Sequence, residues 1–132
     1  MLDRVNQLET FERAYRAAME LYRASRSWPK EERYTLTDQV RRSSRAVCAN
    51  MAEAWAKRAY PRHFASKVTA AHGEAEETLT WIRFAERCGY LDAADADRLA
   101  ARYRQINAGL IRMGATKDQW CPPASIRLGP HA

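Results

Sequence analysis

The chain has 132 residues, of which 46% are hydrophobic and 29% charged, and these values are typical of one folded domain. This composition excludes a disordered chain, and no apolar run approaches the roughly 18 residues that a membrane-spanning helix needs. The formal net charge of +6 favours an anionic partner, most often nucleic acid, although such a charge can also serve solubility alone.

The cysteines and the N-terminus indicate the compartment. Cys48, Cys88 and Cys121 are an odd number without the spacing of a disulfide framework, so reduced thiols are expected. Residues 1–5 lack the apolar segment of a secretory signal. We therefore expect a cytoplasmic protein with no membrane association.

The first predicted helix covers residues 10–25. Four residues recur at spacings of four, three and four, which indicates one buried helical face. The expected core face is Phe11, Tyr15, Ala18 and Tyr22. Trp28-Pro29 should end this segment, since the residue before a proline avoids the helical conformation.

The second predicted helix starts at Thr35 or Thr37, either of which can cap it, and ends near Ala59. Its apolar residues lie within about 60° of one another on a helical wheel. Ser43 and Ser44 fill the gap in the middle of that face. The expected core residues are Leu36, Val40, Val47, Met51 and Ala54.

The third and fourth predicted helices also carry one apolar face each. The third opens at Pro61 and closes at Gly89, and the fourth follows Asp92 and stops at Gly114. The third face consists of Phe64, Val68, Ala71, Ala75, Leu79 and Ile82, and the fourth of Leu99, Tyr103, Ile106, Leu110 and Met113.

Four amphipathic helices with short connections predict an all-α fold, an antiparallel up-down-up-down four-helix bundle. We assign residues 1–113 to this bundle. Residues 114–132 have no helical period of apolar residues and contain three prolines, so we expect an irregular or disordered tail. Trp120, which belongs to this tail, could still dock against the bundle.

The second helix carries a further face opposite its core. Arginines occupy the N-terminal half of that face, and the small residues Ala49, Ala52 and Ala56 occupy the C-terminal half. An alanine seam lets another helix approach, so we predict contact with a neighbouring subunit there, with Asn50 and Glu53 at its border. Alternatively, the alanines are simply good helix formers. Glu53 is expected to pair with Lys57 at the i+4 position.

The sequence lacks the patterns of the common catalytic and cofactor sites. Metal-ligand clusters, phosphate-binding glycine loops and nucleophile elbows are all missing, so we expect no metal, no cofactor and no enzyme activity. His72 and Glu76 share a helix face, but a single such pair is more typical of a surface hydrogen bond than of a ligand set.

Basic residues surround the hairpin between the second and third helices, with Trp55 and Tyr60 among them. Such a patch can hold a phosphate backbone by charge while rings stack on bases. The alternative is a solvated rim whose arginines pair with Glu53, Glu74 or a neighbouring subunit. The candidate nucleic-acid-binding residues are Arg41, Arg42, Arg45, Lys57, Arg58, Arg62 and Lys67.

The stretch ERYTLTDQVRRSSRAVCANMAEAWAKR, residues 32–58, resembles the pattern of the four-helix-bundle family also called the 23S rRNA intervening-sequence or S23-like family. Residues 10–113 follow the family throughout, with AHGEAE and GYL matching its later segments. Two positions depart from it, because Ala54 and Glu74 stand where the family has glycine and serine. The matching residues are Glu32, Tyr34, Leu36, Gln39, Val40, Arg41, Arg42, Asn50, Met51, Ala52, Glu53 and Arg58.

The resemblance implies a homopentameric bundle assembly around a central axis. It also implies a likeness in fold to the basic accessory subunits of diversity-generating retroelements, which engage nucleic acid. We therefore expect a non-catalytic, oligomeric, nucleic-acid-binding accessory protein, with RNA favoured over DNA. The alternative is a scaffold whose basic groove receives an acidic or helical protein partner.

Overall fold

The structure is a computed structural model, and it describes residues 8–122. Four long helices make up most of this part of the chain, and no strand occurs in it. The long helices are α1 (Glu9–Ser25), α2 (Leu36–Ala56), α3 (Pro61–Arg87) and α4 (Ala93–Ala115). A short 3-10 turn, η2 (Lys30–Glu32), precedes α2, and a single-turn helix, α5 (Lys117–Trp120), follows α4.

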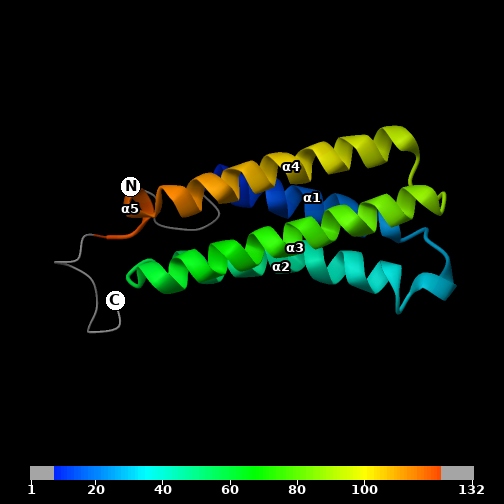
Figure 1. Cartoon of the computed structure of the whole chain (residues 1–132). Coiled ribbons are helices and arrows are strands. Elements are labelled where there is room, and N and C mark those ends of the chain that lie inside the picture. The colour runs from blue at the N-terminus through cyan, green and yellow to red at the C-terminus, as the bar shows by residue number, and fades with distance from the viewer. Residues whose placement is uncertain (1–7, 123–132) are drawn as a thin grey trace.

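The four long helices run in alternating directions along one common axis (Figure 1). Helix α1 packs against α2 and α4, and α3 packs against the same two helices, with α2 and α3 the most extensive pair. In the described chain the backbones of the diagonal pairs, α1 with α3 and α2 with α4, do not come close to each other. The expected up-down-up-down bundle is therefore confirmed.

The helix ends follow local chemistry. Pro61 is the first residue of α3, where its missing N–H has no helical partner to lose. Gly89 adopts a φ of 80°, which lets the chain leave α3 and bring the Tyr90 amide to the Ala85 carbonyl at 2.8 Å. The Asp92 carboxylate caps α4 by accepting a 2.7 Å hydrogen bond from the Asp95 amide. Helix α2 ends at Ala56, three residues before the expected end.

The core lies between the four helices and agrees with three of the four expected faces. The predicted α2 face is at most 7% exposed, and Ser43 and Ser44 between its apolar residues are buried too. Thr78 Oγ1 lies 2.7 Å from Ser43 Oγ, so the two small hydroxyl residues let α2 and α3 approach closely. Leu79 is the one member of the expected α3 face that is only partly buried.

The expected core face of α1 is confirmed at Ala18 and wrong at its three aromatic residues. Tyr15 is 50% exposed, and Phe11 and Tyr22 are only partly buried. The buried residues of α1 are instead Ala14, Ala17, Ala18, Leu21 and Ser25, a stripe turned by roughly 80° from the aromatic one. The two stripes have the same helical period, and the close approach of α1 to its neighbours selects the small residues for the core.

The chain after α4 does not leave the bundle at once. Helix α4 continues past the expected stop at Gly114 to Ala115, and α5 then packs against α3 and α4. The Trp120 ring meets the Trp55 ring edge-on with centroids 6.2 Å apart, and Cys121 is 5% exposed. Residues 123–132, the rest of the predicted tail, lie outside the described residues, so the division at residue 113 stays a prediction.

Two helical glycines have opposite surroundings and provide a matched test of the packing. A Cβ on Gly109 would come closer than 3.0 Å to the Thr10 side chain, whereas a Cβ on Gly73 would meet nothing within 4 Å. We expect Gly109→Ala to lower the free energy of unfolding by about 1–3 kcal/mol through overpacking. We expect Gly73→Ala to raise it by about 0.5–1 kcal/mol through helix propensity.

Urea unfolding followed by circular dichroism measures both effects. Adding Thr10→Ala to Gly109→Ala should recover part of the loss, because it removes the atoms with which the new Cβ collides. A Gly109→Ala variant as stable as the wild type would contradict the close contact between α1 and α4.

Candidate nucleic-acid interface

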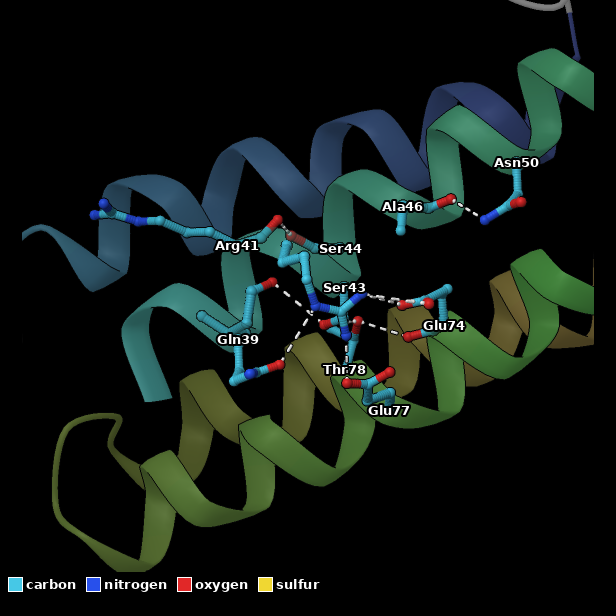
Figure 2. Close-up of polar contacts among 11 residues, drawn as sticks. Gln39, Arg41, Ser43, Ser44, Ala46, Asn50, Glu74, Glu77 and Thr78 are labelled. Carbon is cyan, nitrogen blue, oxygen red and sulfur yellow. Dashed lines mark hydrogen bonds and ion pairs between the residues drawn. The ribbon is translucent and has the colours of Figure 1, made fainter. Parts of the chain in front are cut away.

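Arg41 and Arg42, which are adjacent in the sequence, point to opposite sides of α2. Successive residues on a helix are turned by 100°, so the two side chains meet different neighbouring helices. The Arg41 Nε donates to Ser25 Oγ of α1 at 2.9 Å, and its guanidinium lies 4.9 Å from the Tyr22 ring centre. Figure 2 shows the Arg41 side chain extending away from Glu74 and Glu77.

Arg42 is bound on the α3 side of α2. Its Nη1 lies 3.2 Å from a Glu74 carboxylate oxygen, and its Nη2 forms an ion pair with Glu77. The Glu77 hydrogen bond is the main reason that the pKa of Arg42 is raised. Two carboxylates thus balance this guanidinium, and Arg42 contributes little positive field to the surface.

Arg45 lies one helical turn after Arg41 and faces the same ring. Its guanidinium carbon is 5.7 Å from the centre of Tyr22, so one ring lies next to two cations. Among residues 8–122, neither Arg41 nor Arg45 makes an ion pair. The seam between α1 and α2 therefore keeps an uncompensated positive charge. The helical period of α1 predicts a core position for Tyr22, so the sequence does not indicate that its ring belongs to this site.

The remaining candidate cations lie around the turn between α2 and α3. Arg58 lies 3.8 Å from the Trp55 ring centre, and its Nε donates to the Trp55 carbonyl at 3.0 Å. Lys67 Nζ pairs with Glu53 at 2.7 Å, whereas Arg62 is exposed and Lys57 half-buried, both without an ion pair in the described chain.

The seven predicted binding residues therefore do not form one patch. Arg42 and Lys67 are held by carboxylates of the same chain. Arg41 and Arg45 lie along the seam between α1 and α2. Lys57 and Arg58 follow the end of α2, about 18 Å beyond Arg45 along the helix axis at 1.5 Å per residue, and Arg62 lies in the first turn of α3.

The aromatic contribution to the site also differs from the expectation. Trp55 is 7% exposed and is covered by Arg58 and Trp120, so its ring cannot stack on a base. Tyr60 is half-buried and tilts against His63, with ring centroids 5.8 Å apart. Tyr60 is thus the aromatic residue of the hairpin that retains some access to a ligand.

The residues predicted to contact another subunit lie on the outer side of α2. Ala49 and Ala56 are exposed and Ala52 is half-buried, so the small-residue seam is not covered by the chain's own helices. The Asn50 amide donates to the Ala46 carbonyl at 2.9 Å (Figure 2). The expected pairing of Glu53 with Lys57 is wrong, because α3 brings Lys67 closer to the carboxylate.

Other reactive side chains do not assemble into a catalytic or metal centre in the described part of the chain. No group of three or more histidine, cysteine or acidic residues there could hold a metal ion. Cys48 and Cys88 are free thiols, and burial raises the pKa of the Cys48 thiol to about 11, so it stays protonated at neutral pH. His72 and Glu76 form a long pair of 3.8 Å, and Asn107 donates to the same Glu76 oxygen at 2.9 Å.

Comparisons with known proteins agree with this architecture. The family model for the 23S rRNA-intervening sequence protein matches residues 6–112. A solved protein of unknown function, from the S23 ribosomal protein family of Bacteroides thetaiotaomicron, is 22% identical, with a TM-score of 0.74 over 81% of this chain and 96% of its own. No curated protein matches the chain. The expected likeness to retroelement accessory subunits stays a prediction.

Helix length and hydropathy give one further finding. Within the described residues, none of the helices combines the length and the apolar content that crossing a membrane would require.

The Glu53–Lys67 ion pair predicts a specific acid sensitivity. The hydrogen bond and charge of Lys67 lower the pKa of Glu53, so the stabilisation is present above the unfolded pKa and is lost as pH falls through the folded value. We expect Glu53→Gln to destabilise the protein near pH 6 and to cost progressively less toward pH 3. Urea unfolding at both pH values measures this.

Glu31→Gln is the control, since this exposed glutamate makes no ion pair in the described chain. A destabilisation by Glu53→Gln that stays constant with pH would contradict the electrostatic origin of the effect.

Proposed function

We propose a function for this chain from the premise that it belongs to the 23S rRNA-intervening sequence protein family. In this proposal it is a non-catalytic, cytoplasmic accessory protein that binds nucleic acid as a homo-oligomer. The family is named for sequences within ribosomal RNA, which supports RNA rather than DNA as the ligand.

The observation that carries the proposal is the uneven distribution of charge around α2. On the α3 side, Glu74 and Glu77 balance Arg42. On the α1 side, Arg41 and Arg45 stand without carboxylate partners in the described chain and lie against the Tyr22 ring. Guanidinium groups held in this way can bind phosphate oxygens without first breaking an ion pair.

Oligomerisation would extend such a surface. The uncovered seam of Ala49, Ala52 and Ala56 is small enough for another helix to approach, and the family resemblance favours a pentameric ring. Tyr15 and Met19 provide further exposed apolar area on α1, at 50% and 37% exposure. Several modest sites on one ring would bind a long polyanion more tightly than a single site does.

A protein partner is the second candidate. A groove between the start of α2 and the end of α3 is lined by apolar side chains, including Trp81, Phe84 and Tyr34. Phe84 is 54% exposed and Tyr34 is 81% exposed, an unusual display of rings for a helical surface. Competition separates the two functions, because a scaffold keeps its protein partner in excess unspecific RNA, whereas an RNA-binding surface fills with RNA.

The proposal predicts RNA binding that depends steeply on salt. We expect the affinity for a short single-stranded RNA to fall at least about tenfold between about 50 and 200 mM salt, because each neutralised phosphate releases counterions. The triple variant Arg45→Gln, Lys57→Gln, Arg62→Gln should bind more weakly, and its slope of log affinity against log salt should be shallower by about 2. Fluorescence anisotropy measures both quantities.

The matched control removes the same charge elsewhere. Arg83, Arg87 and Arg104 are exposed on α3 and α4 and make no ion pair in the described residues. Changing these three to glutamine should leave most of the affinity intact. Equal losses in both triple variants would show that only net charge matters, and an affinity that does not change with salt would contradict the proposal.

The oligomer is tested by mass. Light scattering on the purified chain should give a mass several times that of the monomer, and five times is the favoured value. Ala49→Arg with Ala56→Arg should reduce the assembly to monomers, whereas Ala101→Arg with Ala108→Arg on the exposed face of α4 should not. A wild-type protein that is strictly monomeric would contradict this part of the proposal.

A further inference from the structure

A pocket of about 380 Å³ lies at the turn between α1 and α2. This turn is at the opposite end of α2 from the α2–α3 hairpin (Figure 1). We call it the turn pocket. Among the described residues, its charged lining is entirely cationic and includes no carboxylate side chain. The four cations come from the end of α1, the connecting turn and the first half of α2, and they are Arg26, Lys30, Arg33 and Arg41.

These cations are not neutralised by the chain itself. None of the four makes an ion pair with any residue in the described range. Glu32 lies within the same turn, but its two carboxylate oxygens accept hydrogen bonds from Thr35 at 2.6 Å and from Tyr90 at 2.8 Å. These two bonds lower the pKa of Glu32 and keep its charge on the side of α3. Four like charges in one pocket repel one another, so an anion is the favoured occupant.

The pocket also contains a polar group that lacks a partner. Trp28 lines the pocket and is only 7% exposed, and its buried indole N–H has no acceptor within residues 8–122. A buried donor without an acceptor is costly, and native proteins usually satisfy such groups. The indole nitrogen is covered by its neighbours, so an oxygen-rich ligand that displaces part of this cover would supply the missing acceptor together with the missing negative charge.

Arg41 is held in place for this role. Ser25 is 3% exposed and accepts a hydrogen bond from the Arg41 Nε at 2.9 Å, while the Tyr22 ring supports the guanidinium from another direction. Ser25 in turn donates to the Tyr22 carbonyl at 3.0 Å, which partly neutralises the negative end of α1. The terminal nitrogens of Arg41 are left without an acceptor from the described chain.

We propose that the turn pocket binds a phosphate group of the RNA. This inference rests on the proposed function and adds a specific binding site to it. Arg26, Lys30, Arg33 and Arg41 supply the charge, and the Trp28 N–H supplies a directed hydrogen bond to a phosphate oxygen. Arg41 and Arg45 share the Tyr22 ring, so the bound strand continues from the pocket along the seam between α1 and α2.

The experiment compares RNA binding by three proteins in fluorescence anisotropy. The pocket variant is Arg26→Gln, Lys30→Gln, Arg33→Gln, whose three residues are exposed, and the control is the Arg83, Arg87, Arg104 triple glutamine variant. Each is measured with the same RNA carrying either a 5′-phosphate or a 5′-hydroxyl. We expect the pocket variant to lose at least about tenfold in affinity and the control to lose much less.

The two RNAs identify the source of the phosphate. An equal loss with both RNAs places a backbone phosphate in the pocket, whereas a loss confined to the 5′-phosphorylated RNA places the terminal phosphate there. Either result supports the proposal. Wild-type binding that the pocket variant retains in full would overturn the site alone. A wild type that binds neither RNA would overturn the proposed function as well.

Trp28→Phe separates a directed contact from general charge. The change keeps an aromatic ring beside Tyr90, whose ring centroid lies 5.8 Å from that of Trp28, and removes the N–H together with the rest of the five-membered ring. We expect about tenfold weaker RNA binding, because a hydrogen bond to a charged acceptor is lost, with an unchanged salt slope. Circular dichroism confirms that the variant is folded. A folded Trp28→Phe variant with wild-type affinity would overturn the role of the indole.

A competition experiment tests the choice of ligand. An acidic peptide that displaces RNA from the wild type but not from the pocket variant would overturn the assignment of a phosphate to the pocket.

Discussion

The packing of α2 between α1 and α3 is the constraint on which the rest of the structure depends. Consecutive residues on a helix are turned by 100°, so a helix flanked on two sides sends neighbouring side chains to different partners. Arg41 meets the hydroxyl and ring of α1, and Arg42 meets the two carboxylates of α3. Ser43 and Ser44 are buried in the middle of α2, and Ser43 Oγ lies 2.7 Å from the Thr78 hydroxyl. These small residues keep α2 and α3 close enough for the two arginines to meet different helices.

This division separates two electrostatic surfaces on one small bundle. The α2–α3 side is compensated by ion pairs, which screen its arginine from a polyanion. The α1–α2 side keeps its positive charge and places it beside an aromatic ring, from the turn pocket to Arg45. Exposed ion pairs contribute little to the free energy of unfolding. The main effect of the ion pairs on α2 is therefore to determine which cations remain available to bind an anion. The proposed RNA path follows the free ones.

The sequence predicted the fold well because its strongest signals are periodic. Three apolar faces, the proline that opens α3 and the glycine that ends it each depend on local geometry. The α1 face was mispredicted, because alanines and aromatic residues share one helical period and only packing decides between them. The sequence also does not distinguish the free arginines from the paired ones. Glu74 reaches Arg42, and Lys67 reaches Glu53, only because α3 packs against α2 in the tertiary structure. Trp120, far away in sequence, covers Trp55 for the same reason.

The central claim is that RNA binds the arginines facing α1 and not the arginine held by α3. NMR spectra of the arginine Nε–H groups, recorded during an RNA titration, test it residue by residue. We expect the Arg41 and Arg45 signals to shift, whereas the Arg42 signal should stay in place because Glu74 and Glu77 hold this side chain. A titration in which Arg42 shifts and Arg41 does not would contradict it.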